Sequence, residues 1–93
     1  MVSIPIEEIQ EIFINIDPLA LIALGEDDDI YNKTSESLHR RLMNLKTHIS
    51  LERLTHTIYL LLSASFTYLN PSFECCKQIS SQLNQKYLRK APK

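Results

Sequence analysis

The stretch SLERLTHTIYLLLSASFTYL, residues 50–69, decides the fold, because its apolar centre suits either a buried strand or a helix. The apolar residues on either side of that centre recur at steps of three and four, which is the period of a helix. Ser50 is a favourable N-cap. We therefore predict a helix over 51–69, and its apolar content makes it the central, most buried element. Its predicted face comprises Leu51, Leu54, Ile58, Leu61, Leu62, Ser65 and Leu69.

The segments on both sides of this stretch carry the same helical spacing. Downstream, we expect Asn70 to cap a helix that has Pro71 in its first turn. Its apolar face is Phe73, Cys76, Ile79, Ser80, Leu83 and Tyr87. Upstream, a helix is expected to begin within the acidic run 27–29, with one of the three aspartates as its cap. The face of that helix is Tyr31, Ser35, Leu38, Leu42, Leu45 and Ile49.

The first 25 residues predict one further helix and a sharp break. Isoleucines and a phenylalanine recur at helical steps over 4–16, and Ser3 is the expected cap. Asp17 and Pro18 then interrupt the helix, because proline disfavours helical geometry in the residue before it. We expect Asp17 to cap a short extra helical turn near 18–24 that ends at Gly25. The predicted fold is therefore all-α, a compact bundle of four main helices with one short extra turn.

Size and composition agree with one small folded domain. The 93 residues are expected to form a single helical domain over 1–93, with a frayed tail at 88–93. A hydrophobic content of 44% is ordinary for a globular protein, and a single glycine argues against a glycine-rich phosphate loop. The N-terminus does not have the pattern of a signal peptide, and the longest apolar run is too short to span a membrane. The adjacent Cys75 and Cys76 favour reduced thiols, so we expect a cytoplasmic protein without a membrane partner.

The net charge of −1 hides a marked asymmetry along the chain. Residues 1–29 contain eight acidic residues and no lysine or arginine, whereas the rest of the chain contains three acidic residues and all ten lysines and arginines. Two interpretations follow. The acidic third docks on the basic remainder, or an acidic face stays open to a cationic partner. The basic residues are scattered, so direct binding to nucleic acid is not expected.

The stretch LGEDDDIYN, residues 24–32, holds the densest group of candidate functional side chains. A calcium loop needs alternating ligands and a glutamate at its twelfth position, but counting from Asp27 that position is Leu38. We therefore predict no metal site, and interpret Glu26, Asp27, Asp28 and Asp29 as a helix cap combined with exposed acidic surface.

Other combinations of reactive side chains are weak. His39, His48 and His56 do not have the spacing of zinc ligands, and Cys75 lacks a recognisable base and orienting group. Cysteine on such a helix is commonly a small buried apolar residue. Arg40 and Arg41 suit either an anion or a solvated helix face. We predict no cofactor and no catalytic residue.

Three short motifs resemble a small family of uncharacterised bacterial helical proteins across about 80 residues. They are IDPL with Asp17 and Pro18, DIYN with Asp29 and Tyr31, and PSFECCK with Pro71, Glu74, Cys75 and Lys77. The chain departs from the family pattern at Ile16, where tryptophan is usual, and at Asn32, where a second acid is common. The resemblance implies an all-α fold and no known reaction, and helical proteins of this kind also occur as immunity partners of bacterial toxins.

Size, composition and charge together predict a binding protein and not an enzyme. We expect an immunity protein that neutralises a cognate bacterial toxin, a basic nuclease domain, through an acidic surface. The alternative is a structural or regulatory adaptor, or a homodimer, that uses an exposed apolar face of the helix over 51–69. The predicted contact residues for the toxin are Asp17, Glu26, Asp27, Asp28, Asp29 and Tyr31.

Overall fold

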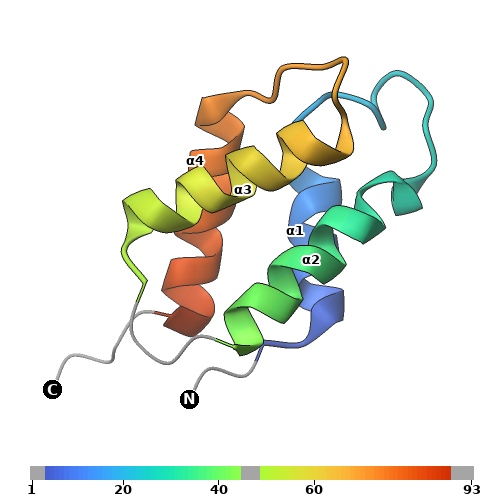
Figure 1. Ribbon diagram of the computed structural model, residues 1–93. Coiled ribbons are helices and arrows are strands. Elements are labelled where there is room, and N and C mark those ends of the chain that lie inside the picture. The colour runs from blue at the N-terminus through green and yellow to red at the C-terminus, as the bar shows by residue number, and fades with distance from the viewer. Residues whose placement is uncertain (1–3, 45–48, 89–93) are drawn as a thin grey trace, which may run out of the picture.

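The computed structural model describes residues 4–44 and 49–88, with the side chains of the last two left out, and its fold is all-α. Four helices make up the domain (Figure 1): α1 (Ile6–Ile16), α2 (Asn32–Met43), α3 (Leu51–Ser65) and α4 (Phe73–Leu83). A 3₁₀ turn, η1 (Asp28–Tyr31), precedes α2, and a π-helical turn, η2 (Asn84–Leu88), follows α4. Within the described ranges no helix has both the length and the apolar character that crossing a bilayer requires.

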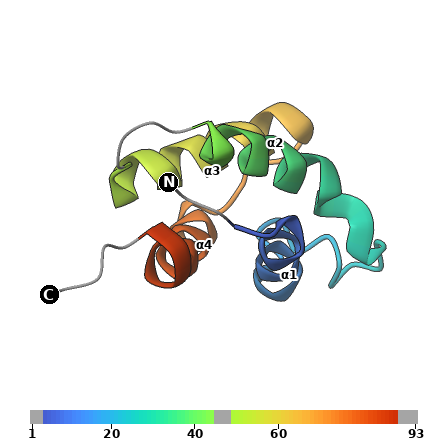
Figure 2. The ribbon, with the colours of Figure 1, turned by 90° about the horizontal axis from the view of Figure 1, so that it is seen from below.

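The helices form two layers that cross each other, with α2 and α3 in one layer and α1 and α4 in the other (Figure 2). Each helix therefore packs on one neighbour in its own layer and one in the opposite layer. The core lies between the layers and draws on all four helices. Its buried apolar members are Ile4, Ile9, Ile12, Phe13, Tyr31, Leu38, Leu42, Leu54, Ile58, Leu62, Cys76, Ile79 and Leu83.

Helices α3 and α4 both begin with a side-chain capping bond, but only in α3 is the cap the predicted residue. The Ser50 hydroxyl accepts a hydrogen bond from the Arg53 backbone N–H at 3.2 Å, so the predicted cap of α3 is confirmed. The predicted Asn70 cap of α4 is wrong: Ser72 accepts from the Cys75 N–H at 3.2 Å, and the helix begins at Phe73. Ser72 stands directly before the helix, so its hydroxyl is closer to the Cys75 N–H than the Asn70 side chain is.

The other predicted helix ends either differ in the structure or fall outside the described residues. Pro5 is the N-cap of α1 and makes no side-chain cap bond, whereas Ser3 lies outside the described residues. Helix α2 ends at Met43, well before Ile49, which is partly buried beyond it. The predictions for Leu45 and for the side chain of Tyr87 also fall outside the described residues, as does the predicted frayed tail over most of its length.

Helix α3 is shorter and less enclosed than its sequence predicts. It ends at Ser65, and three members of the predicted face are open to solvent: Leu51 at 38% exposure, Leu69 at 40%, and Ser65. Because α3 shares an outer layer with α2, only one of its sides faces the core, through Leu54, Ile58 and Leu62. The prediction of a central, most buried helix is therefore wrong.

Candidate functional site

The predicted contact residues lie in one connection between α1 and α2, residues 17–31, which crosses the end of the bundle beside the connection 66–72 (Figure 1). Asp17 ends α1 with a left-handed φ of 52°, and its carbonyl accepts from the Ala20 N–H at 2.9 Å. The predicted short helical turn takes the form of hydrogen-bonded turns over 18–25. Ala20 interrupts regular helix there because its φ is 57°, and Gly25 supplies the predicted positive φ at 109°.

The Asp17 carboxylate ties this connection together. Its two oxygens accept from the Ile22 N–H at 3.2 Å and from the Ala23 N–H at 3.0 Å, which lie three residues beyond the N–H groups that an N-cap at this position engages. A third bond comes from the Tyr31 hydroxyl at 2.5 Å. Burial of Asp17 opposes its ionisation, but these hydrogen bonds outweigh burial and hold the pKa of the carboxyl below its usual value.

Tyr31 anchors the far end of the same connection. Its side chain is buried, and its hydroxyl donates to Asp17 and accepts from the Leu19 N–H at 3.0 Å. The ring lies between Phe13 and Phe66, with ring centroids 6.0 Å from each. Burial first, and then the bond to the Asp17 carboxylate, raise the pKa of the Tyr31 hydroxyl above its usual value.

These contacts give a structural role to two of the predicted contact residues. We expected Asp17 and Tyr31 to contact a partner directly, but the Tyr31 ring is inside the core and the Asp17 oxygens are engaged by three donors of the chain itself. Both residues therefore hold the loop in shape, and a direct contact with a partner stays a prediction. Sequence spacing gave no signal for this pair, because the contact joins residues fourteen positions apart through a turn that has no regular repeat.

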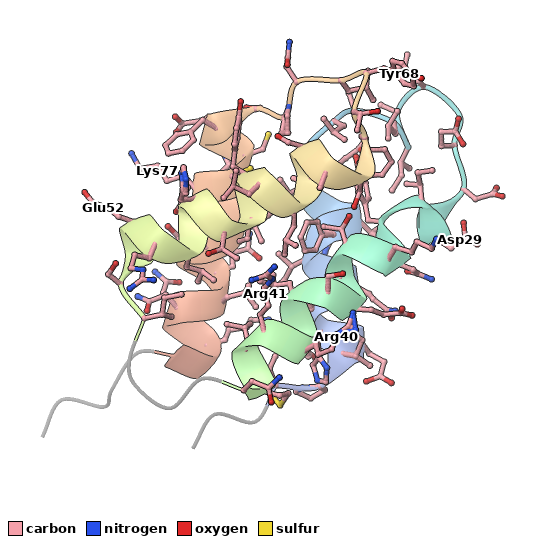
Figure 3. All side chains as sticks on the ribbon, in the orientation of Figure 1. Asp29, Arg40, Arg41, Glu52, Tyr68 and Lys77 are labelled. Atoms are coloured by element: carbon pink, nitrogen blue, oxygen red, sulfur yellow. The ribbon has the colours of Figure 1, made fainter. Side chains whose placement is uncertain are left out.

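The four consecutive acids are placed differently. Glu26, Asp27, Asp28 and Asp29 are all exposed, and within the described ranges none of their side chains makes a hydrogen bond or an ion pair. The expected capping bond from an aspartate is not formed: Asp27 is the N-cap of η1 without a side-chain bond. We call these four residues the acidic loop. Figure 3 shows Asp29 at the end of the molecule where α2 begins, pointing outward.

Internal neutralisation, the other interpretation of the charge asymmetry, finds limited support in the described parts of the chain. They contain a single ion pair, between Lys86 Nζ and Glu8 at 3.5 Å, and the two side chains are 55% and 37% exposed. This contact joins η2 to α1 and does not involve the acidic loop. Exposed pairs of this kind contribute little to stability.

Within the described parts of the chain, which do not include His48, the groups considered for chemistry are dispersed. Residues 4–44 and 49–88 contain no cluster of three or more histidine, cysteine or acidic side chains placed to share a metal ion. Leu38, which occupies the glutamate position of a calcium loop, is fully buried in the core. Cys75 is partly buried and Cys76 is buried. Burial, followed by the neighbouring Cys75, raises the pKa of the Cys76 thiol to about 11.

A second surface lies on α3, where the adaptor or homodimer hypothesis predicted an exposed apolar face without naming its residues. A groove of about 690 Å³ lies between the first half of α3 and the start of α4. Its apolar lining is Leu51, Leu60 and Phe73, which are 38%, 53% and 54% exposed. Helical spacing placed Leu51 and Phe73 on the apolar faces of their helices, and spacing alone could not show that the crossing of α3 over α4 leaves both uncovered.

The arginine pair is exposed on α2. Arg40 and Arg41 border a shallow hollow near Leu61 of α3. In Figure 3 both lie far along α2 from Asp29, so the helix carries acid before its start and base in its last turn. Such a distribution favours the helix dipole, and a solvated helix face accounts for both arginines.

Comparison with family models, with curated protein sequences and with solved structures gave no match. The resemblance to bacterial helical proteins therefore stays a prediction.

Proposed function

We propose that this protein is a non-enzymatic binding protein that neutralises a cognate bacterial toxin by presenting the acidic loop to a basic nuclease domain. The observation that supports the proposal most is the state of the four carboxylates, which are exposed and have no intramolecular partner among the described residues. Acids that served only the fold would be expected to make a side-chain capping bond or to pair with a cation, and among the described residues the acidic loop does neither.

The chemistry of the expected partner matches this surface. A nuclease holds phosphates with cationic side chains, so its active site attracts a compact group of carboxylates. Complementary charge accelerates association and suppresses wrong partners more than it adds affinity. Asp17 and Tyr31 would contribute indirectly, because they fix the turn from which the acidic loop extends. We propose a cytoplasmic location, where such a protein meets the toxin before release.

Binding to the purified toxin domain encoded beside this gene tests the proposal. We expect the variant E26Q/D27N/D28N/D29N to bind at least about tenfold more weakly at low salt, because it loses the long-range attraction. Its affinity should also depend less steeply on salt, since fewer charges are screened. Isothermal titration calorimetry at several salt concentrations measures both quantities.

A matched control distinguishes the effect of where the acids lie from the effect of the protein's net charge. The variant E7Q/E11Q/E36Q/E74Q makes the same change in charge with four exposed acids that lie on helices outside the loop. It should retain most of the affinity. Equal losses in the two variants would show that overall charge and not the acidic loop drives binding, and an unchanged affinity in the loop variant would exclude this surface as the interface.

A further inference from the structure

Three exposed apolar side chains converge on one groove that the acidic loop does not include. Single exposed apolar residues are normal on a protein surface. Here Leu51 and Leu60 of α3 and Phe73 of α4 line the same hollow of about 690 Å³. The Phe73 ring is held in place on one side by Tyr59, with ring centroids 6.0 Å apart. The groove is therefore formed in the free chain. Covering its apolar side chains with another surface lowers the free energy of the system.

The charges around the groove narrow the choice of occupant. Its charged lining residues are Glu52, Arg53 and Lys77, and none of them forms an ion pair within the described part of the chain. Because the rim carries both signs, it complements a rotated copy of itself, in which the acid of one copy faces a base of the other.

We propose that the groove is occupied by a second copy of this chain, related by a two-fold axis. In this arrangement Leu60 of each copy enters the groove of the other between Leu51 and Phe73. Glu52 of one copy faces Lys77 of the other, and the two-fold axis repeats the contact. Both residues lie on the side of the molecule away from Asp29 (Figure 3), so pairing here leaves the acidic loop open. The net charge of −1 per chain adds little repulsion between copies.

Sedimentation equilibrium of the full chain alone, from micromolar to millimolar concentration, tests the pairing without any toxin. The wild-type chain is expected to form dimers within this range. L60D should raise the dissociation constant of the dimer at least tenfold, roughly the loss expected for one buried leucine side chain. L24D is the matched control, because it makes the same substitution at a residue that is 80% exposed and outside the groove. It should dimerise like the wild type.

A charge-swap experiment tests which residues face each other. E52K alone and K77E alone should each dimerise at least about threefold more weakly, because each places like charges together in both symmetry-related contacts. An equimolar mixture of E52K and K77E should recover the lost association, since both contacts of the mixed dimer then join opposite charges. A salt bridge within one chain cannot be restored by mixing, so recovery identifies contact between copies.

Three results would overturn the proposal. A wild-type chain that stays monomeric at millimolar concentration excludes a second copy as the occupant. Dimers that persist unchanged in L60D show that another surface pairs. A mixture of E52K and K77E that stays as weak as either variant alone excludes the facing of Glu52 and Lys77. Circular dichroism confirms that the variants fold, which is expected because all three changed side chains are exposed.

Discussion

The Tyr31 hydroxyl illustrates how a single residue organises the candidate site. It bridges the Asp17 carboxylate and the Leu19 N–H, so its removal takes one of two donors from Asp17 Oδ1, which keeps the Ile22 N–H, and leaves the Leu19 N–H without its acceptor. We expect Y31F to lower the free energy of unfolding by about 2 kcal/mol, the scale for a buried hydrogen bond to a charged group. Amide hydrogen exchange should accelerate over 18–29 and stay unchanged in α3. Uniform acceleration in both segments would contradict a local role.

The same pair predicts two opposite pH effects. The pKa of Asp17 is lowered in the folded state, so its stabilisation is complete above the unfolded-state pKa near 4 and is lost as pH falls through the lower folded value. The pKa of Tyr31 is raised, so its stabilisation is complete below the unfolded-state pKa near 10 and is lost as pH rises above it. Urea unfolding across pH should show the alkaline loss reduced in Y31F and the acid loss reduced in D17N.

The two cysteines should react at different rates although they are adjacent. The Cys76 thiol is buried, and its pKa of about 11 keeps it protonated at neutral pH, whereas Cys75 is partly exposed. Brief treatment of the native protein with iodoacetamide should therefore alkylate Cys75 and spare Cys76, and unfolding in urea should equalise them. Peptide mass spectrometry measures each site. Rapid alkylation of Cys76 under native conditions would show that the first turn of α4 opens readily.

Between elements, the contact of α3 with α4 contains a buried hydrogen bond in an apolar surrounding. Thr55 donates to the Ser80 hydroxyl at 2.8 Å, and Ser80 in turn donates to the Cys76 carbonyl at 3.0 Å. T55V keeps the shape of the side chain and removes this bond, so we expect a loss of about 1 kcal/mol in the free energy of unfolding. S80A should cost a similar amount.

The double variant decides whether the two hydroxyls act as one unit. Because T55V and S80A remove the same bond, T55V/S80A should cost less than the sum of the single variants. Chemical denaturation of the four proteins gives this coupling. Additive losses would show that each hydroxyl stabilises only its own helix, through the bonds to the Leu51 and Cys76 carbonyls.

Helical periodicity explains which parts of the elements were predictable. A step of three or four places residues on one side of a helix, and this local rule identified Ile9, Leu38, Ile58 and Ile79 as core residues. The rule says nothing about how far a neighbouring helix extends. Whether Leu51 is covered depends on where α4 crosses α3, which is a property of the two layers and not of either sequence segment.

In the candidate site, too, local properties were predictable from the sequence and contacts between distant residues were not. Exposure of the acidic loop followed from side-chain chemistry alone, because adjacent carboxylates without cations are expensive to bury. The role of Asp17 did not follow, because its hydrogen-bond partners become neighbours only after the chain has turned through 18–25 and returned at η1. Asp17, which holds the loop in shape, and the residues of the acidic loop are all acidic. The sequence alone does not distinguish the supporting residue from the exposed ones.

At the scale of the whole molecule, the charged and apolar surfaces occupy different places. Asp29 lies at one side of the molecule in Figure 3, and Glu52 and Lys77 lie at the other. The two proposed contacts therefore do not compete for the same surface. A dimer formed through the α3–α4 groove would carry two acidic loops, each directed away from the contact between copies.

This separation predicts the composition of the complex with the toxin domain. The wild-type protein should form a complex of two copies with two toxin domains, and L60D should form a complex of one with one, each with the mass measured by light scattering during size-exclusion chromatography. The affinity per toxin domain should be equal in the two proteins, since a contact that leaves the acidic loop unchanged has no coupling free energy to transmit. Weaker toxin binding by L60D than by the wild-type protein would show instead that dimerisation and the acidic loop are energetically linked.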